Sequence, residues 1–254
     1  ARNLTESLEI AEIFESAKLP LFVAYYRRCY ARFLRLKKLL ESQKYGKITA
    51  VHYRMERLKA SKGASWRENA SISGGGFFVD VGSHALDLLD FLLGPLQQLS
   101  GVAVRERGSD PAAPEEAVTV SFACAQSEAI GTAIWNFHSS ESCDILEITT
   151  AEAKIVLPEF MNGRLVSVKD SNGSVLEEWE EAPPSTVQLP MIQSVTDAIL
   201  ESNPKLCPST SSSALRTARY IDDALTNFYG GRGDAFWTRV DSWPVNSKGS
   251  GYVT

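Results

Sequence analysis

Apolar positions at helical spacing open the chain, and a short apolar run follows them. Residues about 5–17 carry apolar side chains three and four positions apart after Thr5, which suits a helix N-cap. Residues 21–25 are apolar and bounded by Pro20, which predicts a buried strand. A second helix is expected over about 29–42. Its buried side is predicted to comprise Phe33, Leu34, Leu36, Leu39 and Leu40.

Alternation replaces helical spacing over 48–57, where it places Val51, Tyr53 and Met55 on one face of a predicted strand. Residues 59–74 are rich in Ser, Gly and Asn and are expected to form a loop. Such a loop, beside a helix with a polar side, is where ligand contacts tend to lie.

Much of the remaining chain has the pattern of short strands joined by short turns, such as the one at 171–173. Turns of this length favour an antiparallel meander, because a parallel pair needs a longer crossover. Two helices, over about 188–202 and 211–228, are expected to close the domain. The predicted strands cover about 97–105, 116–124, 127–138, 143–150, 153–158, 164–169 and 174–180.

The most informative segment is GGGFFVDVGSHALDLLDFLLGP, residues 74–95, which predicts one largely buried helix. Within it Asp80, His84 and Asp87 stand at i, i+4 and i+7, so they share one side of an α-helix. Gly82 costs roughly 1 kcal/mol there relative to alanine, which indicates that a neighbouring backbone or a ligand approaches closely.

The polar side of this helix has two interpretations. It could simply face solvent, as one side of any amphipathic helix does. However, it lacks the long Lys, Glu, Gln and Arg side chains that usually cover a solvated face, and it carries short acids with one histidine. His84 with Asp80 one turn earlier suits a general base and the carboxylate that orients it.

Three stretches carry a resemblance and together cover about a quarter of the chain: PLFVAYYRRCYARFLRLKKLLESQKYGKITAVHYRM (residues 20–55), SWRENASISGGG (65–76) and the segment at 74–95. In the same order, they resemble segments of the glucose-fructose oxidoreductase, inositol dehydrogenase and rhizopine-catabolism (Gfo/Idh/MocA) family. The third segment is similar to the GGG…D…G.H..D pattern of that family.

The resemblance implies an α+β fold with an open, mainly antiparallel sheet and helices on one face, preceded by the last helix and strand of a Rossmann domain. Residues 1–27 would be this remnant of the dinucleotide-binding domain, 28–229 the substrate-binding and oligomerisation domain, and 230–254 a C-terminal tail. The sequence holds neither the EKP motif of the family nor a G-x-G-x-x-G among its seventeen glycines. We therefore expect this chain alone to bind neither NAD nor NADP usefully and to be nearly inert.

The implied activity is NAD- or NADP-dependent oxidation of a secondary alcohol of a sugar or cyclic polyol, or reduction of the matching carbonyl. His84 would accept the hydroxyl proton as general base, and Asp80 would orient His84. The alternative is a catalytically inactive module derived from the family, which binds carbohydrate or dimerises.

The resemblance also assigns residues around this pair. Trp66 and Arg67 lie in the loop position of the family, where a guanidinium could bind a hydroxyl or carboxylate of the substrate. A surface arginine is the alternative. Tyr25, Tyr26 and Arg27 end the short strand and are expected near the cofactor, with core aromatic packing as the alternative for the two tyrosines.

Four further residues complete the set of candidates. Asp87 and Trp135 are expected substrate contacts. His138 has no carboxylate at a telling spacing, so a satisfied structural role is favoured. Alternation turns His52 away from Val51 and Tyr53, and no role is assigned to it.

Charge and composition limit the kinds of partner that this chain is expected to have. The net charge of −5 argues against a nucleic-acid partner, and no apolar run or leader pattern suggests a membrane span or signal peptide, so a cytoplasmic location is expected. The basic segment at 27–38 could lie on a membrane surface, but an ordinary surface helix is favoured. The four cysteines have no metal-binding or paired spacing, and no metal is expected.

The architecture of the sheet predicts that copies of this chain associate with one another. Helices on one face leave the other face open, so apolar residues such as Val118, Val120 and Phe122 or their neighbours need a cover. A homodimer or higher homo-oligomer through the open face is the predicted arrangement.

Overall fold

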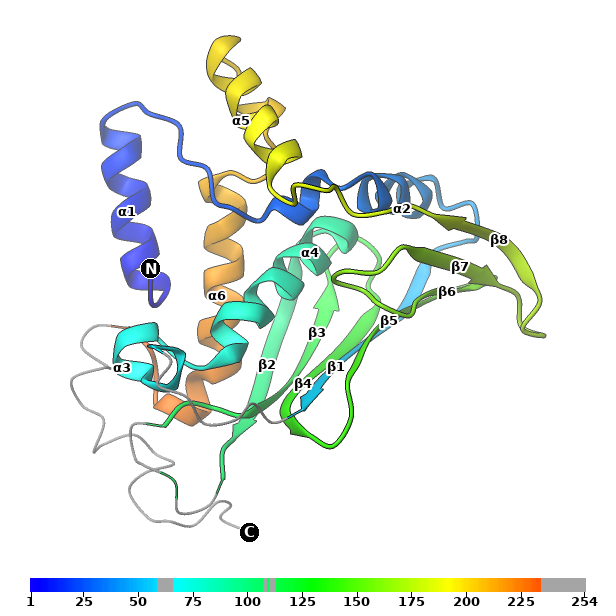
Figure 1. The fold of residues 1–254 in the computed structure, drawn as a ribbon, viewed down its shortest axis with the longest axis horizontal. Helices are drawn as coiled ribbons and strands as arrows, with labels where there is room; N and C mark the ends of the chain where they lie inside the picture. Colours follow the sequence, from blue (N-terminus) through cyan, green and yellow to red (C-terminus); the bar gives the residue numbers. More distant parts are fainter. Residues whose placement is uncertain (59–65, 107–108, 110–112, 234–254) are drawn as a thin grey trace.

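The computed structural model describes residues 1–58, 66–106, 109 and 113–233. Helices stand against one face of a curved sheet, and two of them, α1 and α5, extend away from its body (Figure 1). The predicted tail from 234 onward and the start of the predicted loop at 59–65 lie outside the described residues. The α-helices are α1 Leu4–Ser16, α2 Ala31–Ser42, α3 Ala70–Ser73, α4 Ser83–Leu93, α5 Leu189–Leu200 and α6 Ser211–Tyr229. Shorter 3-10 turns are η1 Tyr26–Cys29, η2 Trp66–Glu68 and η4 Pro204–Leu206, and η3 Phe78–Gly82 is a π-helix.

One sheet of eight strands forms the other layer, in the spatial order β2-β3-β4-β1-β5-β6-β7-β8. All but one of its neighbouring strand pairs are antiparallel, so the predicted fold class is confirmed. The strands are β1 Ile48–Leu58, β2 Leu96–Val104, β3 Ala117–Cys124, β4 Ile130–Ser139, β5 Cys143–Thr150, β6 Lys154–Leu157, β7 Leu165–Lys169 and β8 Val175–Glu180.

The sheet departs from the predicted simple meander at its centre. The strand β1 lies between β4 and β5, parallel to β4 and antiparallel to β5. The β4–β5 connection at 140–142 therefore crosses two interstrand spacings of about 4.8 Å each, which three residues at up to ~3.5 Å apiece can span. The crossover that a parallel pair needs is supplied by α4, β2 and β3, which separate β1 from β4 in the chain.

Alternation along the strands separates a buried face from an open face. Val51, Tyr53 and Met55 of β1 are buried, as predicted. Of the residues predicted for the open face, which were Val118, Val120 and Phe122 or their neighbours, the three named ones lie on the covered face, because they are only 2%, 1% and 4% exposed. Their strand β3 places Thr119 and Ser121 on the open face instead. Exposed apolar residues on the strands that flank β3 include Val102 of β2 and Ile130 and Ile134 of β4.

The N-terminal segment differs from its prediction in two respects. The cap of α1 is Asn3, whose side chain accepts a hydrogen bond from the Glu6 amide, rather than Thr5. The 21–25 run is not a regular strand, because the structure gives it only one isolated bridge, from Phe22 to Thr210. A strand needs a neighbour over several residues to pair its backbone groups, and no second strand lies along this run within the described residues.

The helix α2 buries a narrower side than predicted. Phe33, Leu36 and Leu40 are buried, whereas Leu34 is 40% exposed. Arg32 is buried in its place, with its guanidinium donating to the Glu159 and Phe160 carbonyls. A long arginine stem packs against apolar surface while its head finds backbone acceptors, which the residue type alone does not reveal.

The helix that carries His84 begins with a π-turn. Residues Phe78–Gly82 form this π-helix, and α4 continues from Ser83. A Cβ at Gly82 would lie 2.5 Å from Cδ2 of Phe78, whose ring is fully buried against Trp135. The close neighbour that Gly82 predicted is thus an aromatic ring of the same turn, rather than a backbone or a ligand.

We expect Gly82→Ala to destabilise the protein by about 1–3 kcal/mol, because the Phe78 ring must move to admit the methyl group. Intrinsic helix propensity alone would give the opposite sign, a gain of roughly 1 kcal/mol. Urea unfolding measures the difference. Gly233→Ala is the matched control, since its Cβ would meet its nearest atom, the Thr5 hydroxyl oxygen, at an ordinary 3.7 Å. Greater stability in Gly82→Ala would contradict the proposed clash.

Candidate functional site

His84 lies between two tyrosine rings at the start of α4. The centroid of its ring is 5.3 Å from that of Tyr25, in a T-shaped arrangement, and 5.6 Å from that of Tyr26. Both tyrosines come from the segment that leads into η1, so the structure brings together the residues that were predicted as base and as cofactor neighbours. His84 is half-buried.

Asp80 meets Arg67 rather than standing directly over His84. The Arg67 Nε donates to Asp80 Oδ2 at 2.6 Å, and both side chains are about one-third exposed, at 32% and 34%. Asp80 belongs to the π-turn, which contains an extra residue, so the α-helical i, i+4 register with His84 does not hold. Its negative charge still raises the pKa of His84, which makes its effect on the imidazole electrostatic. Trp66 is 52% exposed, and the Arg67 guanidinium lies 4.4 Å from its ring centroid.

A loop that the sequence did not mark as functional borders the same site. Arg27 donates from Nε to the Met161 carbonyl at 2.9 Å and from Nη2 to Asn162 Oδ1 at 2.8 Å. Its guanidinium also lies 4.9 Å from the Tyr26 ring centroid. Met161 and Asn162 are more than a hundred positions away in the chain, and no spacing or residue type connects them to Arg27.

The surroundings of His84 keep its imidazole neutral. Burial, and next the positive charge of Arg27, lower the pKa of His84 from its ordinary 6.5 to about 4, against the opposing effect of Asp80. Burial also raises the pKa of Tyr25, as does the nearby Asp87 carboxylate. At neutral pH the site therefore offers an unprotonated imidazole nitrogen beside a protonated phenol. An unprotonated imidazole is the form that can accept a proton.

The lowered pKa of His84 predicts a loss of stability on acidification. Between pH 6.5 and about 4 the unfolded chain binds a proton that folded His84 does not, so the free energy of unfolding decreases as the pH falls through this window. His84→Gln should lose less stability over the same window than the parent chain. Denaturant titrations at several pH values measure this, with His52→Gln, at an exposed position of β1, as the control. Equal pH profiles for His84→Gln and the parent would contradict the assignment.

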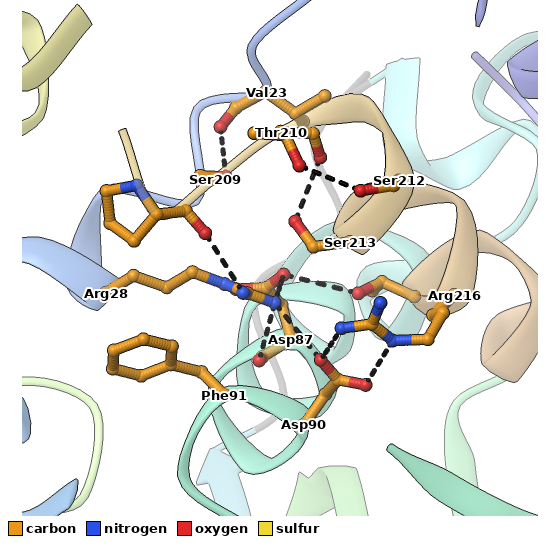
Figure 2. Close-up of polar contacts among 12 residues, drawn as sticks. Val23, Arg28, Asp87, Asp90, Phe91, Ser209, Thr210, Ser212, Ser213 and Arg216 are labelled. Carbon is orange, nitrogen blue, oxygen red and sulfur yellow. Dashed lines mark hydrogen bonds and ion pairs between the residues drawn. The ribbon is translucent and has the colours of Figure 1, made fainter. Parts of the chain in front are cut away.

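Two predicted substrate residues lie elsewhere. Asp87 is 1% exposed, and its carboxylate is bound by the Arg28 guanidinium at 2.7 Å through both oxygens (Figure 2). Trp135 is fully buried and packs against the rings of Tyr53 and Phe78. Both residues are inaccessible to a ligand in this structure, so we assign them to structural contacts.

The other histidine predictions agree with the geometry. His138 Nε2 lies 2.7 Å from Glu116 Oε1, so its carboxylate partner is the residue just before β3 rather than one in its own strand. His52 is exposed and shares a hydrogen bond with Thr132 on the open face of the sheet.

The glycine-rich turn before the π-helix is closed to a phosphate. The Gly76 amide donates to the Glu115 carboxylate at 2.8 Å, and a Cβ at Gly75 or Gly76 would lie 3.3 Å from that carboxylate. Glu115 is buried and also accepts from the Tyr229 hydroxyl. A buried carboxyl group occupies the position that an anion would take, so the residues of this turn do not fit the pyrophosphate of a dinucleotide.

The described residues contain no group of three or more His, Cys, Asp or Glu side chains arranged to hold a metal ion. Every helix among the same residues is too short or too polar to cross a membrane.

Comparisons with known proteins assign this architecture. Residues 33–156 match the family model described as GFO/IDH/MocA C-terminal domain. A curated relative, Oxidoreductase P35 of Formosa agariphila, is 24% identical over 210 residues, which cover 81% of this chain and 63% of the relative. The structure of a levoglucosan dehydrogenase with NADH and levoglucosan superposes with a TM-score of 0.72 at 18% sequence identity. The matched region covers 89% of this chain and 68% of the levoglucosan dehydrogenase chain. The structure of an aldose-aldose oxidoreductase from Caulobacter crescentus, complexed with glycerol, gives a TM-score of 0.72 at 19% sequence identity. The matched region covers 87% of this chain and 65% of that oxidoreductase chain.

The open sheet with helices on one face agrees with the Gfo/Idh/MocA C-terminal domain that the matched family model describes. The match to this family model covers just under half of the chain. The chain spans 63% of the length of the curated relative it matches.

Proposed function

We propose that this chain carries the substrate-binding half of an NAD- or NADP-dependent oxidoreductase. The substrate would be a sugar or cyclic polyol, reacting at a secondary alcohol or the matching carbonyl, with His84 as the general base. The observation that carries the proposal is the neutral, half-buried imidazole of His84, held between Tyr25 and Tyr26 beside two charged side chains. The relative and the solved structures named above are oxidoreductases, which supports the reaction class.

The residues around His84 have distinct roles in this proposal. His84 accepts the hydroxyl proton, and the Asp80 carboxylate stabilises the imidazolium that forms. Arg67, paired with Asp80, presents guanidinium donors to substrate oxygens. Trp66 offers an exposed ring to the apolar face of a sugar. Tyr25, Tyr26 and Arg27 would border the nicotinamide, which supplies the hydride acceptor when bound.

The domain organisation belongs to the same proposal. Residues 1–27 would be the end of the dinucleotide-binding domain and 28–229 the substrate domain, followed by the tail at 230–254. Because the glycine turn is closed by Glu115, we propose that the pyrophosphate is not held by residues of this chain.

The direct test is a spectrophotometric assay for nicotinamide reduction at 340 nm, with a panel of aldoses, inositols and anhydrosugars and with both NAD and NADP. The protein should be assayed in its full reading frame and as the present chain. We expect turnover from the former with at least one sugar or polyol. Absence of turnover across the panel, combined with measurable sugar binding, would favour the second candidate function.

That second candidate is a module that binds carbohydrate or dimerises without catalysis. The carboxylate of Glu115, which accepts from the Gly76 amide, favours it, because it closes this turn to a phosphate. Calorimetric titration of the present chain with NAD and with sugars separates the two: dinucleotide binding in the low micromolar range would argue against it.

We also propose that two copies associate through the open face of the sheet. Ile134, 43% exposed, lies between Thr119 and Arg54 in the strand register and is central to this face. Ile134→Lys should convert a dimer to a monomer in sedimentation experiments at tens of micromolar protein, because a buried charge without a partner opposes association. Ile199→Lys, at a 58% exposed site on α5, is the matched control and should leave the dimer intact. A monomeric parent chain would refute this arrangement.

A further inference from the structure

Three buried side chains, Arg28, Asp87 and Asp90, and the partly exposed Arg216 form a charged network (Figure 2). The Arg28 guanidinium binds Asp87 through two hydrogen bonds of 2.7 Å and reaches Asp90 at 3.4 Å. Asp90 in turn accepts from Arg216 at 2.8 and 2.6 Å. The side chains of Arg28, Asp87 and Asp90 are 4%, 2% and 1% exposed, so the pairs are shielded from water.

The network lies next to the rings that hold His84. Arg28 belongs to η1 and follows Tyr25 and Tyr26 by three and two positions, and Asp87 follows His84 by three positions on the same helix. The Arg28–Asp87 pair and the contacts of the tyrosines with His84 therefore join the same two elements, less than one helical turn apart.

A third element supports the same carboxylates. Thr217 of α6 donates to Asp87 at 3.3 Å, and the Tyr220 hydroxyl donates to Asp90 at 2.8 Å. Arg28 also donates to the Pro208 carbonyl at 3.2 Å, ahead of α6. Three segments that are distant in sequence are thus fixed against one another by directional hydrogen bonds.

The physical chemistry of this network explains why it can set an orientation. Buried ion pairs contribute little net stability over apolar packing, because their desolvation offsets their attraction. A bidentate pair between a planar guanidinium and a carboxylate nevertheless fixes both the distance and the angle of the groups that carry it. The four-residue η1 is a single short turn held mainly by its contacts with other elements, and this pair is its directional link to α4, so it constrains where Tyr25 and Tyr26 lie against His84.

We propose that Arg28 and Asp87 are positioning residues for His84: their bidentate pair fixes η1 against α4 and so holds Tyr25 and Tyr26 around the imidazole. The inference deepens the proposed function, on which it rests, by assigning a role to two residues that touch neither substrate nor cofactor.

The test follows the ionisation of His84 by NMR in the folded chain labelled at its three histidines, with His84→Gln identifying the resonance. In the parent chain His84 should stay neutral down to about pH 5, since burial lowers its pKa to about 4. In Asp87→Asn the pair is lost, the rings loosen and the imidazole gains water, so the pKa of His84 should rise by about one unit or more toward its ordinary value.

The sign of this shift separates positioning from simple electrostatics. Removing the Asp87 charge and leaving Arg28 unpaired would by themselves lower the pKa of His84, because positive charge then dominates nearby. A rise therefore requires that the packing around the imidazole has changed. An unchanged or lowered pKa of His84 in folded Asp87→Asn would overturn the proposal.

Two more variants complete the design. Asp222→Asn removes a carboxylate from another buried pair, with Arg232 at the far end of α6, and should lower the melting temperature without moving the pKa of His84. An equal rise in Asp222→Asn would overturn the proposal, because general destabilisation would then explain the effect. If Asp87→Asn does not fold, Thr217→Val decides: removal of one hydrogen bond to Asp87 should give a smaller rise, and no rise would overturn the proposal.

This measurement needs no turnover, so it is separable from the proposed function. Unchanged turnover in His84→Gln would refute the catalytic role of His84. The NMR measurement would still decide whether Arg28 and Asp87 position the rings around His84. A pKa of His84 in Asp87→Asn that stays at the parental value would refute positioning even if His84 proved to be the base.

Discussion

Replacing His84 with Gln should lower turnover by about 10²- to 10⁴-fold in the protein assayed with its nicotinamide cofactor, because a positioned base is worth that much. Glutamine keeps much of the size and polarity of the side chain but accepts no proton at neutral pH. Steady-state kinetics measure the effect, and the melting temperature of the variant excludes unfolding as its cause.

Asp80→Asn is the matched variant for this prediction. It should cost less than His84→Gln, because the Asp80 charge acts on the imidazole from a distance while its carboxylate is bound to Arg67. A simple solvent-facing helix side predicts that neither substitution changes turnover, since exposed positions usually tolerate change within about 0.5 kcal/mol. Near-parental turnover in His84→Gln would therefore remove the proposed base.

Local patterns were sufficient to predict most of the elements, and the family resemblance supplied the fold class. The alternation of Val51, Tyr53 and Met55 correctly marked the buried face of β1, because the period of a strand is visible in a few residues. The apolar helix at 74–95 was likewise predictable from its composition. The resemblance of that segment to the family then located His84, which the structure places between the two predicted tyrosines.

The errors arose where distant parts of the chain meet. The alternation of Val118 with Val120 and Phe122 showed that they share a face but not which face carries the helices. The insertion of β1 between β4 and β5 depends on pairing across more than 70 residues, for which local pattern contains no signal.

Charged residues gave the least reliable signals. Asp87 shares a helix with His84, and its spacing alone suggested a common site. Its actual partners, Arg28 and Thr217, are 59 and 130 positions away in the chain, and they bury it completely. A carboxylate that looks solvent-facing in sequence can thus be the centre of a buried ion pair, and only the fold distinguishes the two.

Trp135 provides the largest expected effect on stability. Its indole ring is fully buried, 4.9 Å from the Phe78 ring centroid and 5.4 Å from that of Tyr53. Trp135→Ala should reduce the free energy of unfolding by about 3–5 kcal/mol, because removal of the indole leaves a cavity between β4 and the π-turn. Urea unfolding followed by far-ultraviolet circular dichroism measures this loss.

Trp135→Phe distinguishes packing from substrate contact. The indole Nε1 of Trp135 is buried without a hydrogen-bond partner among the described residues, so phenylalanine removes an unsatisfied donor while keeping most of the ring. The loss of buried apolar area destabilises the variant, whereas removal of the unsatisfied donor stabilises it. The free energy of unfolding of the variant should therefore lie within about 1 kcal/mol of that of the parent chain. If Trp135 is a core residue, KM for the sugar should also stay unchanged. A several-fold rise in KM in a fully stable Trp135→Phe would instead restore Trp135 to the substrate site, because only a ligand contact would then separate the two side chains.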